Sequence, residues 1–254
     1  MQLLHFKQRG QGQPLLLLHG LFGSLDNLGM VARGLAHHYQ VISIDLPDHG
    51  NSYHSDHFSY NDYAQAVFKL MDHLELPQAS ILGHSMGGKV AMSMALTQPK
   101  RVEKLIVADI APVAYPPRHE GIFKGLNNVD LASIKNRQDA EESLAEFIYE
   151  AGVRQFLLKS LQQTEQSWQW RFNLAMLQRD YAVLSEGITA TTSYTKPTLF
   201  IKGELSDYLN TQQRPLITSL FTQAEARVML GCGHWLHAEK PAEFNRIVTH
   251  FINA

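Results

Sequence analysis

Residues 79–89 read ASILGHSMGGK and contain the strongest structural signal in the chain. The apolar pair Ile81-Leu82 is followed by Gly83, and a helical pattern runs over Lys89–Leu96. Glycines on both sides of Ser85 permit a strained turn, in which a larger side chain would collide with the neighbouring strand or helix. We therefore predict a strand, a sharp turn that presents Ser85, and a helix whose N-terminus favours negative charge beside the serine.

Short apolar runs alternate with amphipathic helical patterns along most of the chain, which is typical of an α/β fold with a mostly parallel sheet. The predicted strands are Leu15–Leu18, Val41–Asp45, Ser80–Leu82, Lys104–Ala108, Thr198–Lys202 and Arg227–Leu230. Apolar residues at spacings of three and four predict a helix over Asn61–Leu74. Pro241 is expected in the first turn of the last helix, where its missing N–H costs nothing.

The alternation stops between Val113 and Ala190, where only helical periodicity remains. One apolar stripe consists of Ala140, Leu144, Phe147, Ile148 and Ala151, and a second of Leu174, Leu177, Tyr181 and Leu184. We expect residues 113–190 to form a helical cap, or lid, inserted into one α/β core made of residues 1–112 and 191–254.

Composition limits the classes of function. The 254 residues contain 22 lysines and arginines against 24 acids, a balance that argues against a nucleic-acid partner. Cys232 is the single cysteine, so no internal disulfide can form. No stretch reaches 18 uninterrupted apolar residues, and residues 1–14 lack the pattern of a secretory signal. We expect no membrane span and a cytoplasmic protein that handles a small molecule.

A serine hydroxyl needs an adjacent base to become a good nucleophile. In chains with this kind of serine turn, the acid and then the histidine follow the serine. His234 lies in Gly231-Cys-Gly-His-Trp235, directly after the last predicted strand, so we expect it at the same edge of the sheet as Ser85. His237 is the alternative base.

Two carboxylates compete for the role of the acid. Asp109 ends the strand Lys104–Ala108, and a carboxylate among apolar residues requires a partner such as His234. Asp207 follows the next strand, where the acid commonly stands three residues after a glycine. Here Asp207 is four residues after Gly203, and Ser206 occupies the usual position. We favour Asp109 and keep Asp207 as the alternative acid.

The oxyanion that forms during acyl transfer requires backbone N–H donors. One is expected from Met86, after the nucleophile, and the other from the loop His19-Gly-Leu-Phe-Gly23. Leu21 is the preferred donor there and Phe22 the next. The segment Asp45–Ser52 is interpreted as a support that holds this loop by hydrogen bonds, rather than as a border of the site.

Three aromatic side chains receive structural rather than functional interpretations. We interpret Trp168 and Trp170 as cap core residues; the alternative is that they line an acyl channel. His84, beside the nucleophile, is interpreted as a packed residue of the turn.

Taken together, these motifs give the chain a resemblance to the YbfF-type esterases of the α/β-hydrolase superfamily. The stretches that carry it are HGLFGSLDNLG (19–29), GHSMGGK (83–89), DIAPV (109–113), WRFN (170–173) and GHWLHAEKP (233–241). The resemblance implies an α/β-hydrolase fold and hydrolysis of acyl-CoA thioesters and simple carboxylic esters. It also supports Asp109, because that family takes its acid from the DIAPV position; the additional Ser206-Asp207 pair is a departure.

We therefore expect a serine esterase or thioesterase (EC 3.1 type) with a Ser-His-Asp triad and an acyl-enzyme intermediate. Its partner would be a small acyl ester or acyl-CoA, without metal or organic cofactor. A capped hydrolase of this fold could instead act as a C–C bond hydrolase, lyase or peroxidase, because the fold does not separate these reactions. A non-enzymatic scaffold should have lost the nucleophile, base or oxyanion hole, and this sequence retains all three.

Overall fold

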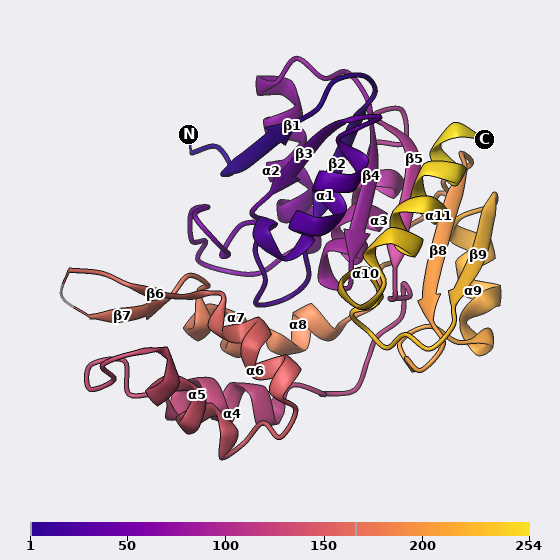
Figure 1. Ribbon diagram of the computed structural model, residues 1–254. Helices are drawn as coiled ribbons and strands as arrows, with labels where there is room; N and C mark the ends of the chain where they lie inside the picture. Colours follow the sequence, from indigo (N-terminus) through magenta and orange to yellow (C-terminus); the bar gives the residue numbers. More distant parts are fainter. Residues whose placement is uncertain (1, 166) are drawn as a thin grey trace.

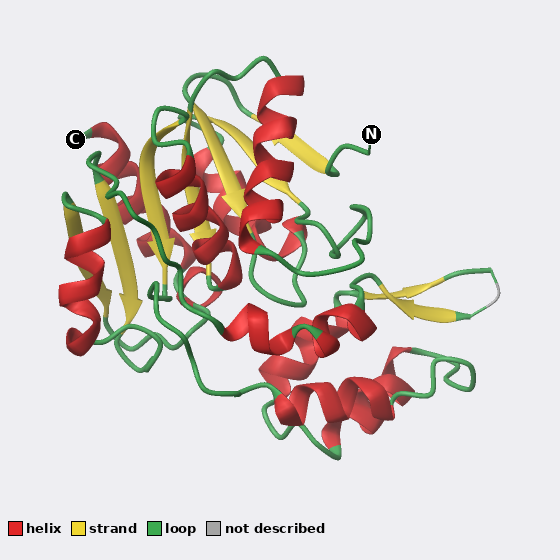
Figure 2. Cartoon of the chain, turned by 180° about the vertical axis from the view of Figure 1, so that it is seen from behind, coloured by secondary structure: helices red, strands yellow, loops and turns green. Residues whose placement is uncertain are grey.

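A computed structural model describes residues 2–165 and 167–254, in which seven strands form one sheet with helices on both faces (Figure 1, Figure 2). Across the sheet the order is β1 (Phe6–Arg9), β3 (Gln40–Ile44), β2 (Pro14–Leu18), β4 (Ala79–His84), β5 (Val102–Ala108), β8 (Thr198–Gly203) and β9 (Ala224–Met229). All neighbours are parallel except β1, which runs antiparallel to β3. The predicted α/β class and mostly parallel sheet are confirmed.

Two apolar clusters cover the two faces of the sheet, because successive side chains of a strand point to opposite sides. Leu15 and Leu17 of β2 pack into one cluster, and Leu16 and Leu18 pack into the other. The first cluster is completed by α1 (Gly29–Leu35) and α11 (Pro241–Asn253), and the second by α2 (Tyr60–His73), α3 (Met86–Thr97) and α9 (Arg214–Leu220). The short helices η1 (Leu25–Leu28), η2 (Thr211–Gln213) and α10 (Leu236–Glu239) lie in the loops. Among the described residues, no helix is long and apolar enough to cross a membrane.

Residues 113–190, which we call the cap segment, lie beyond the carboxyl ends of the parallel strands (Figure 1). The segment connects β5 to β8, which are direct neighbours in the sheet. It contains α4 (Glu120–Asn128), α5 (Arg137–Ala145), α6 (Ala151–Leu158), β6 (Leu161–Gln163), β7 (Trp168–Trp170), α7 (Leu174–Arg179) and α8 (Tyr181–Ser185). The division of the chain at residues 113 and 190 stays a prediction.

The structure differs from the sequence interpretation at several elements. The edge strand β1 was not predicted, because its sequence, FKQR, is mostly polar and exposed. The antiparallel hairpin β6–β7 was also missed, since each strand has only three residues. The stripe through residues 140–151 is not one helix: α5 ends at Ala145, and Phe147 is partly exposed. The last strand begins at Ala224, not Arg227, and leaves Leu230 outside it.

The turn between β4 and α3 depends on close backbone contacts. Ser85 has a φ of +52°, a backbone conformation that residues other than glycine rarely adopt. A Cβ atom at Gly87 would lie 2.4 Å from the carbonyl oxygen of Leu18, and one at Gly83 would lie 2.1 Å from the carbonyl oxygen of Gly87. Only glycine therefore allows β4, the start of α3 and β2 to approach so closely.

Replacing Gly87 with alanine should lower the free energy of unfolding by roughly 2–4 kcal/mol, because the added methyl group overlaps backbone that cannot move aside. Urea unfolding followed by far-UV circular dichroism measures this change. The matched control is Gly29→Ala at the start of α1, where φ is −61° and, apart from the adjoining backbone, no described atom lies within 4 Å of the new Cβ. This control should be neutral or stabilising by up to about 1 kcal/mol. Equal losses in the two variants would contradict the packing argument.

Candidate active site

Ser85, His234 and Asp109 form a continuous chain of hydrogen bonds at the carboxyl edge of the sheet. Nε2 of His234 lies 3.0 Å from Oγ of Ser85, and Nδ1 of His234 lies 2.8 Å from Oδ2 of Asp109. The three residues come from the end of β4, the end of β5 and the loop after β9. This arrangement lets His234 accept the serine proton while the carboxylate orients the ring.

Asp109, not Asp207, is the carboxylate that contacts His234. Asp109 is fully buried, with Oδ1 accepting a hydrogen bond from the backbone N–H of Gly203 at 3.0 Å. The hydroxyl of Ser206 donates to Oδ2. Asp207 is exposed and pairs with the guanidinium of Arg118 at 2.7 Å, which lowers the pKa of the Asp207 carboxyl. The structure therefore brings the preferred acid to the histidine and leaves the alternative acid outside.

Aromatic rings surround His234 and restrain its position. The Tyr208 ring stacks on the His234 ring with centroids 4.1 Å apart. Nε2 of His84 lies 2.9 Å from the carbonyl oxygen of His234 and acts as the donor, since a carbonyl only accepts. Burial keeps the pKa of His84 well below its ordinary value. His84 therefore does more than pack in the turn, because it holds the backbone of His234.

His237, the alternative base, lies behind this arrangement. The centroids of the His237 and His84 rings are 4.3 Å apart, and the His237 side chain is buried. Burial, followed by the effect of His234, lowers the pKa of His237 to about 3. The ring that meets Ser85 is that of His234.

The loop after β2 reaches the nucleophile. Leu21 and Met86, the two residues predicted as oxyanion donors, line the same cavity as Ser85. The backbone N–H of Phe22 donates instead to Nε2 of His49 at 3.2 Å. Phe22 has a φ of +61°, and its ring packs against the cap segment, with its centroid 5.1 Å from that of the Phe172 ring. The second-choice donor is therefore already engaged.

The segment Asp45–Ser52 supports this loop, as predicted. Oδ1 of Asp45 accepts from the backbone N–H of Leu25 at 2.7 Å, and Nε2 of His19 accepts from Leu46 N–H at 3.1 Å. Burial lowers the pKa of both His19 and His49, in the latter to about 3, so both rings are neutral and can accept. Nδ1 of each ring donates to a backbone carbonyl, which fixes the tautomer.

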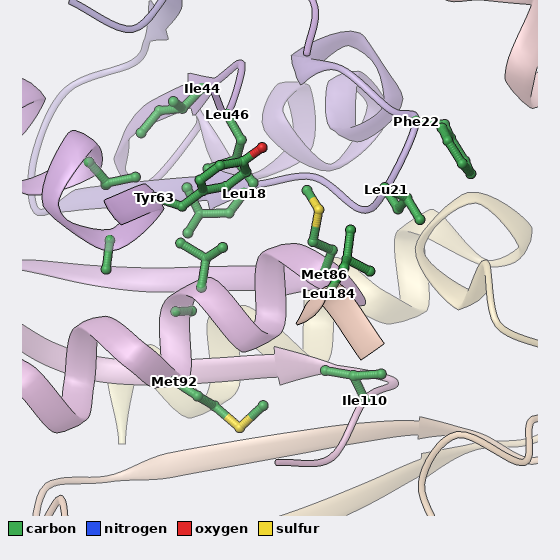
Figure 3. Packing of buried hydrophobic residues seen from close by; sticks show 14 of the residues in the cluster. Leu18, Leu21, Phe22, Ile44, Leu46, Tyr63, Met86, Met92, Ile110 and Leu184 are labelled. Carbon is green, nitrogen blue, oxygen red and sulfur yellow. The ribbon is translucent and has the colours of Figure 1, made fainter. Parts of the chain in front are cut away.

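The cavity beside Ser85 is small and has an apolar wall. Its volume is about 40 Å³, and the side chains of Leu21, Met86, Ile110 and Leu184 lie together along it (Figure 3). Neither tryptophan lines it: Trp170 is buried against Phe172 in a stacked pair, and the Trp168 ring lies under the Arg137 guanidinium. The core interpretation therefore holds for Trp170, although within a hairpin.

Sequence reasoning missed three residues at this site. The sequence marks Ser206 only as the residue at the usual acid position. Its hydrogen bond to Asp109 becomes visible only in the tertiary structure. Nothing in the sequence distinguishes Tyr208 from other loop tyrosines. Lys89 could have been singled out from the sequence, because it is the only charged residue in the apolar run Met86–Leu96. Within residues 2–165 and 167–254, no group of three or more His, Cys, Asp or Glu is placed to hold a metal ion.

Known proteins resemble the chain over almost its whole length. A family described as alpha/beta hydrolase fold matches residues 13–241. Esterase YbfF of Escherichia coli is 39% identical over 241 residues, covering 94% of this chain and 93% of that protein. The sn-1-specific diacylglycerol lipase of Xenopus laevis is 34% identical over 251 residues, 96% of this chain and 80% of the lipase. The solved structure of a marine microorganism esterase, 37% identical, matches with a TM-score of 0.96 over 99% of this chain and 100% of that one.

Replacing Asp109 with asparagine should lower kcat for hydrolysis of p-nitrophenyl butyrate by about 10³- to 10⁴-fold, because the histidine loses its anionic partner and preferred tautomer. Asp207→Asn is the matched control. Its carboxylate is exposed and bonds only to Arg118 among the described side chains, so we expect less than about a fivefold change. Steady-state kinetics with both variants decide the matter, and a larger loss in Asp207→Asn would reverse the assignment of the acid.

Proposed function

The chain belongs to the α/β-hydrolase fold family and is an ester-hydrolysing serine hydrolase, and we propose that Ser85, His234 and Asp109 are its catalytic triad. The observation that carries the proposal is the hydrogen-bond chain from Ser85 Oγ through His234 to Asp109. The burial of Asp109 supports it further, because a buried carboxylate with two additional donors is held in one orientation.

The first half of the reaction transfers the acyl group to Ser85. His234 takes the hydroxyl proton at Nε2 as Oγ attacks the carbonyl carbon. The resulting oxyanion accepts hydrogen bonds from the backbone N–H groups of Met86 and Leu21. Met86 is the first residue of α3, so its N–H has no partner within the helix and is available to a ligand. His234 then gives its proton to the leaving alcohol or thiol, and the acyl-enzyme remains.

The second half releases the acid. A water molecule enters beside His234, loses a proton to Nε2 and attacks the acyl carbon. The second oxyanion occupies the same hole, and its collapse breaks the bond to Ser85 Oγ, which recovers the proton from His234. Asp109 stabilises the imidazolium in both halves without taking the proton itself.

Carboxylic esters and acyl-CoA thioesters are the proposed substrate class. Both offer an acyl carbonyl to Ser85, and the side chains of Leu21, Met86, Ile110 and Leu184 form an apolar wall for the acyl chain. The cavity beside Ser85 is small, about 40 Å³, and therefore favours short acyl chains over long ones.

Replacing Ser85 with alanine should lower kcat/KM for p-nitrophenyl butyrate by at least about 10⁴-fold, because no other group in the triad can form the acyl-enzyme. The variant should also lose labelling by a fluorophosphonate probe, with mass spectrometry of the wild type placing the adduct on Ser85. Ser219→Ala, an exposed serine on α9, is the control and should keep both properties. Labelling of Ser85→Ala at full yield would show that another residue is the nucleophile.

A substrate panel tests the thioester part of the proposal. We expect wild-type enzyme to hydrolyse both short p-nitrophenyl esters and the matching acyl-CoAs, with kcat/KM falling as the acyl chain lengthens. Activity on esters alone would restrict the function to a carboxylesterase. Absence of turnover on both classes would contradict the proposed reaction and bring C–C bond hydrolysis forward.

A further inference from the structure

The last strand of the sheet has an edge without a neighbouring strand. β9 pairs with β8 on one side and with no described strand on the other (Figure 1). The carbonyl groups of Gln223 and Met229 accept hydrogen bonds from the β8 side. Because successive residues of a strand turn their backbone groups to opposite edges, Ala226 and Val228 present theirs to the outer edge.

This outer edge is open to solvent. Ala226 is exposed, and 52% of the Val228 surface is exposed. Proteins commonly protect an edge strand with a proline, a bulge or lysine side chains, because it can otherwise pair with another chain. The sequence of β9, AEARVM, has no proline or lysine, and the register between β8 and β9 runs without a shift. The strand is therefore able to accept a further strand.

The charges of β9 are complementary to those of a second copy of the same strand. Glu225 and Arg227 lie on one face of the strand, 3.6 Å apart, and both side chains are about half exposed. In an antiparallel pair with a two-fold axis at Ala226, Glu225 lies opposite the partner's Arg227, and Arg227 opposite the partner's Glu225. These are positions without backbone hydrogen bonds between the strands, where side chains approach most closely. Opposite charges in such positions stabilise a strand pair.

The other face of β9 is complementary in size. Ala224, Ala226 and Val228 line a groove of about 510 Å³ together with Ile217 of α9. In the same antiparallel arrangement, Val228 lies opposite the partner's Ala224, and Ala226 lies opposite its own copy. The two small residues leave room in the groove for the valine of the partner. Burial of Val228, which is exposed in the single chain, would add to the stability of the pair.

The opposite edge of the sheet lacks this complementarity. In β1, Lys7 and Arg9 stand two residues apart, as Glu225 and Arg227 do in β9, but both are basic. An antiparallel pair of β1 strands with its axis at Gln8 would bring Lys7 opposite the partner's Arg9. Like charges in such positions destabilise a strand pair. Self-association is therefore expected at β9 and not at β1.

We propose that the outer edge of β9 is the interface of a homodimer, in which two copies pair antiparallel about a two-fold axis at Ala226 and form one continuous sheet. The N–H of Ala226 donates to the carbonyl of the partner's Ala226, and that of Val228 to the partner's Ala224. The N–H of Ala224 already donates to Phe221 within the chain. A contact with two-fold symmetry closes after two copies, so it gives a dimer and not a filament. The proposal does not depend on the reaction at Ser85.

Sedimentation velocity over about a hundredfold range of protein concentration tests the dimer. We expect the wild type to sediment as a dimer at the higher concentrations. Arg227→Glu and Glu225→Arg should each weaken the dimer by at least about tenfold in Kd, because both cross-strand ion pairs become like-charge pairs. An equimolar mixture of the two variants should form a dimer again, since an acidic strand then faces a basic one.

Two further variants serve as controls. The double variant, with Glu225→Arg and Arg227→Glu in one chain, restores opposite charges across the axis and should dimerise like the wild type. Lys7→Glu makes the same change of charge at the β1 edge and should leave the association unchanged. Far-UV circular dichroism of each variant verifies that the chain is folded before its association is compared.

Several outcomes would overturn the inference. A wild type that stays monomeric at every concentration would show that β9 does not pair with its own copy. Species larger than a dimer that grow with concentration would contradict the two-fold contact. Unchanged association in both single variants, or no dimer in their mixture, would exclude the register centred on Ala226. Loss of the dimer in Lys7→Glu would move the interface to the β1 edge.

Discussion

The close approach of the turn after β4 to the end of β2 is the constraint on which the rest of the site depends. The Cα of Gly87 lies so near the carbonyl groups of Leu18 and His19 that a methyl group would overlap both. The same approach places Gly20 beside Ser85, where a Cβ atom on Gly20 would lie 3.3 Å from the serine Cβ. Ser85 and the loop that carries Leu21 are therefore held at a fixed separation by backbone packing alone.

Buried polar groups then fix the loops around this contact. His19 and His49 are neutral acceptors for backbone N–H groups, and Asp45 accepts from two more, so the loops after β2 and β3 share one network. Asp48 extends it to the cap segment, because its carboxylate accepts from Tyr63 and from the Asn173 amide. Such networks stabilise only when every member is satisfied, which makes the loops rigid together.

The geometry of the sheet explains why two positions in the chain could supply a carboxylate to His234. β5 and β8 are parallel neighbours, so residues at their carboxyl ends lie at the same edge, within reach of one histidine. In this chain the carboxylate that bonds to His234 is that of Asp109, directly after β5. The loop after β8 contributes the Ser206 hydroxyl as a further donor to it. Asp207 is exposed and pairs with Arg118, a residue that lines the cavity beside Ser85. A buried carboxylate needs donors, and the end of β8, the loop after it and the loop after β9 supply them to Asp109.

The sequence by itself determined the α/β class, the serine turn and the late histidine, because these follow from local patterns: apolar runs, glycine positions and order along the chain. The expectation of a loop supported by Asp45–Ser52 came from the same kind of reasoning. The tertiary structure alone showed that Asp109, and not Asp207, bonds to His234, since both follow a strand and only three-dimensional pairing brings one of them to the histidine. It alone showed β1 and the β6–β7 hairpin, whose short or polar strands carry no periodic signal. It alone placed Lys89 in the cavity, because burial of a charge depends on what packs around it and not on its neighbours in sequence.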